Sequence, residues 1–242
     1  MIKCKNLSFA YEQGAEVLKN ITLNVKKGER VGIIGANGAG KSTLLRILIG
    51  LEKDYAGGVS VNDLEVVKKN YPVIRKMAGY MFQDAENQLF MPTVRQDVSF
   101  ALINYGYDDK YVRERTNAAL KTVGISDIAD KPTWKLSGGE KKLVCIAVMI
   151  ASEPEIVIMD EPTNSLDPYN RKQLIDTVNS LQKTTLIASH DLDMILDTCD
   201  RAVLLSDGKI AADGIAHDVL TDKELLEGHR LLLPLSCRQS GK

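Results

Sequence analysis

The stretch VGIIGANGAGKST, residues 31–43, decides the fold of this chain. Its first part, Val31 to Ile34 with one glycine, is a short apolar run typical of a strand buried on both faces of a parallel sheet. A Gly-x-x-x-x-Gly-Lys-Ser motif follows directly, and a helix is expected to begin near Lys41. This order of strand, glycine-rich loop and helix predicts an α/β protein with a phosphate-binding loop.

The chemistry expected of this loop is the binding of ATP. Glycines let the backbone wrap closely around phosphate oxygens, and the helix N-terminus adds a partial positive charge. We expect Lys41 to reach the β- and γ-phosphates and Ser42 to offer its hydroxyl to Mg²⁺. The residues expected to hold the nucleotide here are Gly35, Asn37, Gly38, Ala39, Gly40, Lys41, Ser42 and Thr43.

Two acidic residues follow a second apolar run. Asp160 and Glu161 come directly after Ile156 to Met159, at the carboxyl end of an expected buried strand, where α/β sheets bind ligands. Asp160 is placed to hold Mg²⁺ or its water, and Glu161 to orient and deprotonate the attacking water. Without the phosphate loop, an acidic pair at an exposed strand end would be the favoured explanation of these residues, and with the loop it is disfavoured.

Two further segments have both a functional and a structural explanation. His190 ends another expected buried strand and could reach the same crevice, although a single histidine is usually structural. In Leu136-Ser-Gly-Gly-Glu140, Ser137 can cap a helix that continues to Ile150, and the glycines leave the helix N-terminus open to an anion. A capped helix alone also accounts for this segment.

The apolar pattern outside these motifs predicts how the chain is divided into subdomains. Alternating apolar residues before Gly28 predict an N-terminal antiparallel β subdomain, and longer helical patterns predict an inserted α-helical subdomain. We expect one domain over residues 1–242 with three parts. They are the nucleotide-binding α/β core at 1–84 and 154–222, the helical subdomain at 85–153, and a tail at 223–242 that begins with a short helix, KELLEGHRLLL.

Composition argues against several other classes of protein. A formal net charge of -1 and a pI near 6.3 give no electrostatic reason to expect binding to nucleic acid. The four cysteines form no CxxC pair, and the three histidines form no ligand cluster, so no zinc or redox motif is readable. The longest apolar run, Leu143 to Ala151, is too short to span a bilayer.

Taken in order, GANGAGKST, Gln83, LSGGE, IVIMDEPTNSLDP and His190 closely resemble the nucleotide-binding subunit of ATP-binding cassette (ABC) transporters over nearly the whole chain. The resemblance implies a head-to-tail dimer that encloses two ATP molecules. The LSGG segment of one subunit, with Ser137, Gly138 and Gly139, would close on ATP held by the phosphate loop of the other.

The same resemblance assigns roles to individual residues. Tyr11 would stack on adenine, Gln83 would link Mg²⁺ to the transport partner, residues 165–167 would cross the dimer seam, and His190 would be the switch near the γ-phosphate. From the residues alone, Tyr11 could instead be an aromatic packed at a strand end and Gln83 an ordinary loop residue. The residues assigned to catalysis are Lys41, Gln83, Glu161 and His190, and those assigned to the metal are Ser42, Gln83 and Asp160.

One position departs from the family pattern. Many members carry arginine where this sequence has Leu143, in the helix that follows LSGGE. The departure puts local helix contacts and the rate of turnover in doubt, while the phosphate contacts are unaffected.

A finer resemblance follows Gln83. The run FQDAENQLFMPTVRQDVSFALINYG, and ENQLF above all, is similar to the ATPase subunit of energy-coupling-factor transporters, which import cobalt, nickel or vitamins, and HRLLLPLS is similar to the cobalt-type members. The resemblance implies contacts of Gln88, Leu89 and Phe90 with a separate transmembrane coupling subunit, although simple packing would also explain them. It also implies a small membrane subunit that binds the solute, a homodimer or paralogue heterodimer of ATPases, and a peripheral place on the cytoplasmic face of the membrane.

Two alternatives belong to other functional classes. One is a soluble ATP-driven switch protein of repair or translation, since the fold alone does not determine function. Such relatives usually carry long coiled-coil insertions or two cassettes, and this chain has neither. The other is a nucleotide-binding regulator without turnover, which the presence of Glu161 and His190 argues against.

Overall fold

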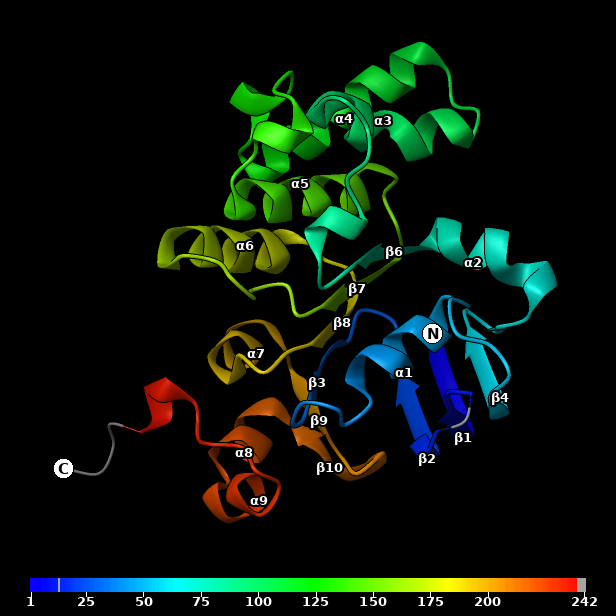
Figure 1. Ribbon diagram of the computed structural model, residues 1–242, viewed down its shortest axis with the longest axis vertical. Helices are drawn as coiled ribbons and strands as arrows, with labels where there is room; N and C mark the ends of the chain where they lie inside the picture. The colour runs from blue at the N-terminus through cyan, green and yellow to red at the C-terminus, as the bar shows by residue number, and fades with distance from the viewer. Residues whose placement is uncertain (13, 239–242) are drawn as a thin grey trace. The chain divides into compact units, whose positions relative to one another are not determined.

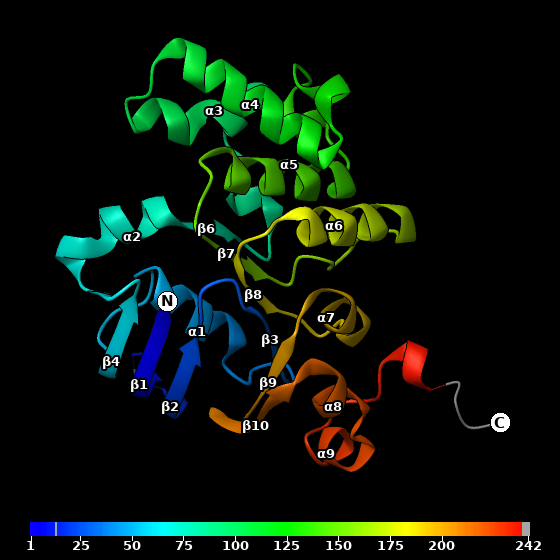
Figure 2. The ribbon, with the colours of Figure 1, turned by 180° about the vertical axis from the view of Figure 1, so that it is seen from behind.

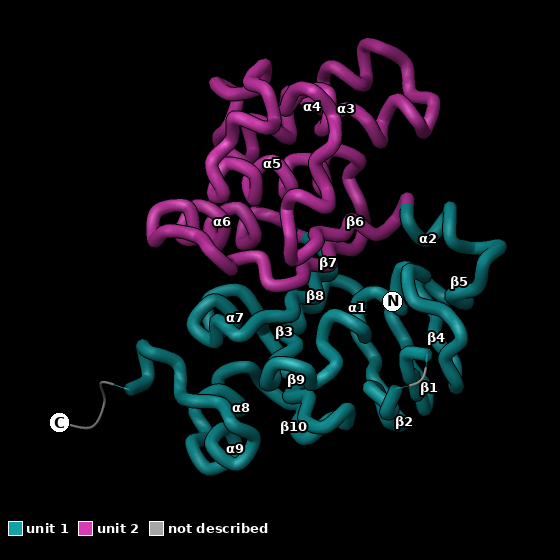
Figure 3. Tube along the Cα trace, viewed as in Figure 1, with its two compact units in different colours: residues 1–75, 183–242 teal, residues 76–182 magenta. Residues whose placement is uncertain are grey.

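The computed structural model describes residues 1–12 and 14–238, which form two compact units. The first unit comprises residues 1–75 and 183–242, and the second comprises residues 76–182 (Figure 3). The first unit contains the phosphate loop, and the second contains the acidic pair and the LSGGE segment. The subdomain boundaries expected at residues 84 and 154 remain a prediction.

The first unit begins with the antiparallel sheet that the N-terminal alternation predicts. Its strand order is β2-β1-β4-β5. In β1 the inward residues are Ile2, Cys4, Leu7 and Phe9, and the alternation shifts between Cys4 and Leu7, where Asn6 has a φ of 51° and the pairing register slips. The bounds are β1 Ile2–Ala10, β2 Glu16–Val25, β4 Ala56–Val61 and β5 Leu64–Glu65.

A second, mixed sheet of the first unit surrounds strand β3 (Arg30–Ile34). β3 lies parallel between β8 (Thr184–Ala188) and β9 (Arg201–Ser206), and β10 (Lys209–Ile215) pairs antiparallel with β9 (Figure 1). Val31 to Ile34 are all buried, as their apolar run predicts. The phosphate loop therefore leaves the carboxyl end of a strand that is bonded on both sides.

The helices of the first unit follow these strands, and the tail differs from its prediction. The helix expected over KELLEGHRLLL ends at Gly228, because the chain turns at Arg230, which has a φ of 61° and donates its N–H to the Glu227 carbonyl. A separate 3₁₀ turn, η5, follows. The bounds are η1 Lys68–Asn70, α1 Lys41–Leu48, α7 Leu192–Thr198, α8 Ala216–Thr221, α9 Lys223–Gly228 and η5 Leu235–Cys237; α2 Tyr71–Met77 leads from the first unit into the second.

The second unit combines a pair of parallel strands with four longer helices. Strand β6 (Ala78–Met81) pairs with β7 (Ile156–Asp160), and helices α3, α4 and α5 pack on one another (Figure 2). Within residues 1–12 and 14–238, no helix is both long and apolar enough to cross a membrane. The helices and turns are α3 Val94–Asn104, α4 Asp109–Val123, α5 Gly138–Ala151, α6 Pro168–Ser180, η2 Ala85–Asn87, η3 Ser126–Ile128 and η4 Thr133–Lys135.

Local sequence signals set where these four helices begin. Thr93, Asp108, Ser137 and Asp167 are their N-caps, and each side chain accepts a hydrogen bond from a backbone N–H of the first turn. In α3 and α5 the third helical residue returns a hydrogen bond to the cap, which completes a capping box. The cap predicted at Ser137 is confirmed.

Helix α5 also shows what the departure at Leu143 means for the structure. Leu143 is buried, within an apolar face that continues through Val144, Ile146 and Ala147. A leucine at this position adds apolar burial and leaves no charge to satisfy. The structure therefore accommodates the departure from the family pattern as ordinary core packing.

Helix α5 packs closely on strand β6 at Gly79. A Cβ built at Gly79 would lie 2.6 Å from Met149 Cγ and 2.9 Å from the Met149 carbonyl oxygen. We predict that Gly79→Ala lowers the free energy of unfolding by about 1–3 kcal/mol, because the backbone oxygen cannot move aside alone. Chemical denaturation of the purified chain measures the effect.

The matched control for this prediction is Gly58→Ala in strand β4. A Cβ at Gly58 meets no atom within 4 Å, and Gly58 has no positive φ. Its unfolding free energy should stay within about 0.5 kcal/mol of wild type. Equal stability of the two variants would contradict the close packing of α5 on β6.

Candidate functional site

The phosphate loop has the geometry that its motif predicts. It spans Gly35 to Gly40 between β3 and α1, and Gly40 is the N-cap of α1 with a φ of 101°. Lys41 is buried, and its Nζ donates to the carbonyl oxygens of Gly35 at 2.8 Å and Ala36 at 3.3 Å. The ammonium therefore lies across the loop, at the N-terminus of a helix, where an anion is favoured.

Tyr11 lies beside the helix that follows the phosphate loop. Its hydroxyl shares a hydrogen bond of 3.1 Å with Thr43 Oγ1 and donates to Glu52 at 3.4 Å. Its ring packs edge-on against Phe9 at 4.9 Å between ring centroids and is 41% exposed. The structure thus brings Tyr11 to the first turn of α1 with part of its ring open to a ligand.

His190 lies at the same edge of the mixed sheet as the phosphate loop. Strands β3 and β8 are parallel with Ile33 opposite Ala188, and the Ser189 N–H donates to the Ile33 carbonyl at 3.2 Å. After the fully buried Ser189, the exposed His190 precedes Asp191, whose carboxylate caps helix α7. The strand-end position predicted for His190 is confirmed.

In the second unit, Asp160 is the last residue of strand β7 and Glu161 follows it directly. Asp160 and Glu161 are both buried, which excludes the alternative of an exposed acidic strand end. Tyr80 of the neighbouring strand β6 donates its hydroxyl to Asp160 Oδ2 at 3.4 Å. Glu161 has a φ of 47°, so the chain turns sharply directly after the strand. Buried carboxylates are retained where they bind cations or protons.

A residue that the sequence analysis did not identify contacts the acidic pair. The Lys142 side chain of α5 is 6% exposed, and its Nζ donates to the carbonyl oxygens of Gln83 and of Glu161. Burial lowers the pKa of Lys142, against the opposing effect of acidic neighbours that include Asp160 and Glu161. The sequence signal that could have pointed to Lys142 is its position directly before the longest apolar run of the chain.

The segment Leu136 to Glu140 leads into α5, with Ser137 as the N-cap and Gly138 as the first helical residue. Ser137 Oγ accepts the Glu140 N–H, and Glu140 Oε2 accepts the Ser137 N–H at 2.7 Å. Lys131 donates to Glu140 at 2.7 Å, and this bond, with that from Ser137, lowers the pKa of Glu140. A Cβ at Gly139 would lie 2.5 Å from Asn170 Nδ2 of α6, so a larger residue there would require the Asn170 side chain to move. The turn is thus rigidly held.

Gln83 and Gln88 differ in their surroundings. Gln83 is exposed after strand β6. The Gln88 side chain is used inside the second unit, because its Oε1 accepts the Phe82 N–H at 3.2 Å and its Nε2 donates to the Cys145 carbonyl at 3.3 Å. Packing therefore accounts for Gln88, while Gln83 is open to a ligand or partner.

Next to these residues lies an exposed apolar patch, here called the aromatic surface, made of Phe90, Phe100 and Ile103. Their exposed fractions are 64%, 37% and 59%. Phe90 and Phe100 meet edge to face at 4.7 Å, and Ile103 is one helical turn beyond Phe100 on α3. The buried Asp97 fastens the loop, since Oδ1 accepts the N–H groups of Phe90 at 3.2 Å and Met91 at 3.1 Å.

The predicted site residues therefore form a group in each unit. The first unit gathers Tyr11, the phosphate loop and His190, which offer an ammonium, a helix N-terminus and an aromatic ring. The second unit gathers oxygen and amide groups around the ends of β6 and β7, and places the LSGGE turn at the start of α5. Hydroxyl and carboxylate oxygens such as those of Ser42 and Asp160 are the donors that Mg²⁺ prefers. These are the parts that phosphoryl transfer requires.

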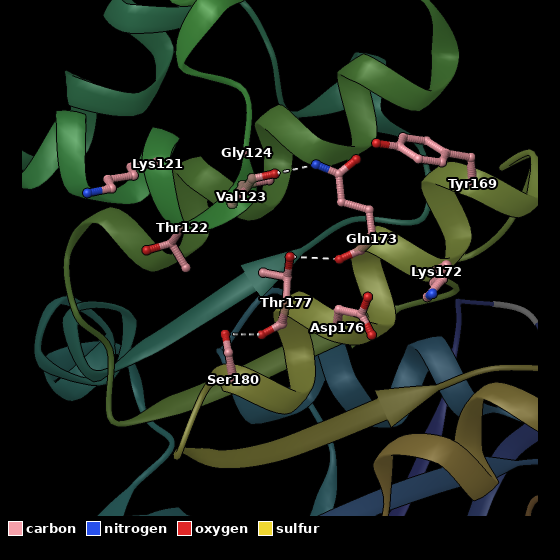
Figure 4. Close-up of a pocket in the computed structure, with 10 residues that line it drawn as sticks. All are labelled: Lys121, Thr122, Val123, Gly124, Tyr169, Lys172, Gln173, Asp176, Thr177 and Ser180. Carbon is pink, nitrogen blue, oxygen red and sulfur yellow. Dashed lines mark hydrogen bonds between the residues drawn. The ribbon is translucent and has the colours of Figure 1, made fainter.

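A separate pocket of about 430 Å³ lies between α4 and α6 in the second unit (Figure 4). Gln173 Nε2 donates to the Val123 carbonyl at 2.7 Å and closes the end of α4. None of the predicted site residues lines this pocket. Its lining residues are Lys121, Thr122, Val123, Gly124, Tyr169, Lys172, Gln173, Asp176, Thr177 and Ser180.

Comparison with known proteins agrees with this geometry. Residues 18–164 match the family described as ABC transporter. A Geobacter sulfurreducens protein that bears the name ABC transporter ATP-binding protein is 42% identical over 238 residues, covering 98% of this chain and 96% of that protein. An energy-coupling factor transporter ATP-binding protein of Methanocaldococcus jannaschii is 38% identical over 239 residues, covering 97% and 86%.

Solved structures are similar over the same length. One is cbiO1 from Clostridium perfringens, described as part of the ABC transporter complex cbiONQ, with 36% identity, a TM-score of 0.83 and coverage of 94% of this chain and 93% of that one. Another is a dimeric ATP-binding cassette in a post-hydrolysis state, bound to ADP and phosphate, with 29% identity, a TM-score of 0.82 and coverage of 89% and 99%. They confirm the predicted phosphate-loop α/β fold with its antiparallel N-terminal sheet. The chain therefore belongs to the ABC transporter family, as one of its ATP-binding subunits.

Proposed function

We propose that this ABC ATPase powers an importer of the energy-coupling-factor type, which moves cobalt or nickel ions or a vitamin through a separate transmembrane subunit. The observation that carries the proposal is the aromatic surface, which the buried Asp97 holds in place on the segment that follows the exposed Gln83. The similarity to an energy-coupling factor transporter ATP-binding protein and to cbiO1 supports it.

For hydrolysis we assign a role to each group of residues. In the first unit, Lys41 binds the β- and γ-phosphates, Ser42 offers its hydroxyl to Mg²⁺, and His190 contacts the γ-phosphate. In the second unit, Asp160 holds Mg²⁺ or its water, and Glu161 orients the attacking water and accepts its proton. The metal, when bound, neutralises charge that develops on the phosphate oxygens.

The active form in this proposal is a dimer, either of two identical chains or of this chain with a paralogue. Tyr11 stacks on adenine, and Ser137, Gly138 and Gly139 close on the nucleotide held by the other subunit. Residues 165–167 cross the seam between the subunits. The similarity to a dimeric cassette bound to ADP and phosphate supports this arrangement.

The aromatic surface is proposed to dock on the transmembrane coupling subunit. Aromatic side chains on rigid elements are frequent anchors of protein interfaces. Phe90 meets this requirement, because Asp97 fastens its backbone and Phe100 supports its ring. Gln83 is assigned the role of linking Mg²⁺ to the docked partner. Gln88 supports the segment from inside.

The other partners follow from this arrangement. We place the chain peripherally on the cytoplasmic face of the membrane, with a small membrane subunit that binds the solute. The choice between cobalt, nickel and a vitamin is assigned to that subunit. No role for nucleic acid is proposed.

The first prediction from this proposal concerns ATP binding. Lys41→Ala should weaken ATP binding by about 1.5–3 kcal/mol, or roughly 10- to 100-fold in Kd, because it removes a charged donor to the phosphates. Calorimetry with the purified chain measures the change. Lys53→Ala, an exposed lysine outside the loop, is the control and should bind like wild type. Equal affinities of the two variants would remove Lys41 from this role.

The second prediction separates binding from chemistry. Glu161→Gln keeps the size of a buried side chain, so ATP affinity should stay near wild type while hydrolysis falls by about 100-fold or more, since general-base catalysis is lost. ATP should then trap a dimer that light scattering detects. Turnover close to wild type would exclude Glu161 as the base.

The third prediction tests the aromatic surface. Phe90→Ser should abolish co-purification with a transmembrane protein from gently solubilised native membranes, because loss of an aromatic anchor typically costs about 2 kcal/mol or more. ATP hydrolysis by the isolated chain should not change. Ile215→Ser, equally exposed but outside the surface, is the matched control. Retention of the partner by Phe90→Ser would contradict the docking role.

The same purification, read by mass spectrometry, tests the proposed function as a whole. Recovery of a transmembrane coupling subunit together with a small solute-binding membrane protein supports the importer. Recovery of ribosomes or DNA-repair proteins in place of membrane proteins would overturn it.

A further inference from the structure

Helix α5 is fastened through side-chain nitrogen atoms to the segment that follows strand β6 at three points. Lys141 Nζ pairs with Glu86 at 2.6 Å, Lys142 Nζ donates to the Gln83 carbonyl, and Gln88 Nε2 donates to the Cys145 carbonyl at 3.3 Å. These contacts all lie within the second unit. The segment and the helix therefore shift together rather than separately.

Lys142 differs from the other two points because it also reaches the acidic pair. Its Nζ lies 3.5 Å from the Glu161 carbonyl oxygen, on the residue directly after strand β7. Strands β6 and β7 are parallel neighbours, with Met81 opposite Met159. Lys142 thus joins the chain just beyond the carboxyl ends of both strands.

Stability alone does not explain a lysine at this position. A buried ammonium is costly unless it is well bonded, and burial lowers the pKa of Lys142. A methionine of similar length would fill the same space without a charge, and such replacements of buried ions are often neutral or stabilising.

We infer that Lys142 is a positioning residue that fixes the Gln83 backbone relative to the Glu161 backbone. When a membrane partner shifts the segment at Gln83, Lys142 carries the shift to the residue that orients the attacking water. The inference rests on the proposed function, since it describes how that same site is regulated. Lys142 itself need not contact ATP.

The test compares Lys142→Met with Lys141→Met in the full chain. Lys141 is the matched control, because its Nζ is fastened to the same segment through Glu86 at 2.6 Å. For Lys142→Met, kcat for ATP should fall by about 10- to 100-fold, since a displacement of about 1 Å at a reacting group can cost this much. KM and the ATP affinity measured by calorimetry should stay near the wild-type values. Resistance to urea should not decrease.

Two comparisons complete the expected result. Lys141→Met should keep kcat within about twofold of wild type. Lys142→Arg, which keeps the charge and the donors, should retain more turnover than Lys142→Met. This pattern separates positioning from a general weakening of the segment.

Four outcomes overturn the inference. Wild-type turnover in Lys142→Met would do so, as would equal losses in Lys141→Met and Lys142→Met. A joint loss of ATP affinity and stability in Lys142→Met would show a purely structural lysine. A wild-type chain that binds ATP without hydrolysing it would overturn the proposed function as well, and this is visible before any variant is compared.

Discussion

The functional part of the first unit depends on the hydrogen bonds that hold strand β3 between the parallel strands β8 and β9. Bonds on both sides leave β3 no freedom to shift, so the phosphate loop leaves the sheet at one defined point. The same ladder brings Ser189 against Ile33 and so carries His190 to the edge where the loop lies. A phosphate site built from main-chain groups requires such rigidity, because glycine-rich loops have little side-chain packing of their own.

The second unit keeps charged groups buried near one another. Asp160, Glu161 and Lys142 are almost fully removed from solvent, and each such group costs free energy unless it is bonded. The carbonyl oxygens of Gln83 and Glu161 satisfy Lys142, while Tyr80 donates to Asp160. Buried charge of this kind concentrates at sites of chemistry, where stability is given up for pre-organised electrostatics.

The segment from Gln83 to Phe90 combines two roles that a linear pattern does not separate. The Gln88 side chain points inward and bonds the segment to α5. The Phe90 side chain is exposed, and its backbone N–H donates to the buried Asp97. An exposed aromatic side chain on a fastened loop is suited to binding a partner, because little conformational freedom remains to be lost. Helix α5 connects this segment with the LSGGE turn at its own N-terminus.

By itself the sequence determined what is local: the strand, glycine loop and helix around Lys41, the cap at Ser137, and the carboxylates after Ile156 to Met159. Each depends on a short run of neighbouring residues, so pattern and chemistry suffice. Only the tertiary structure decided that Lys142 joins Gln83 to Glu161, across 59 and 19 residues, and that Gln88 packs inward. The chain also ends α9 at Gly228, earlier than its apolar pattern predicts. Such contacts are set by which elements the fold brings together, and spacing along one chain does not contain that information.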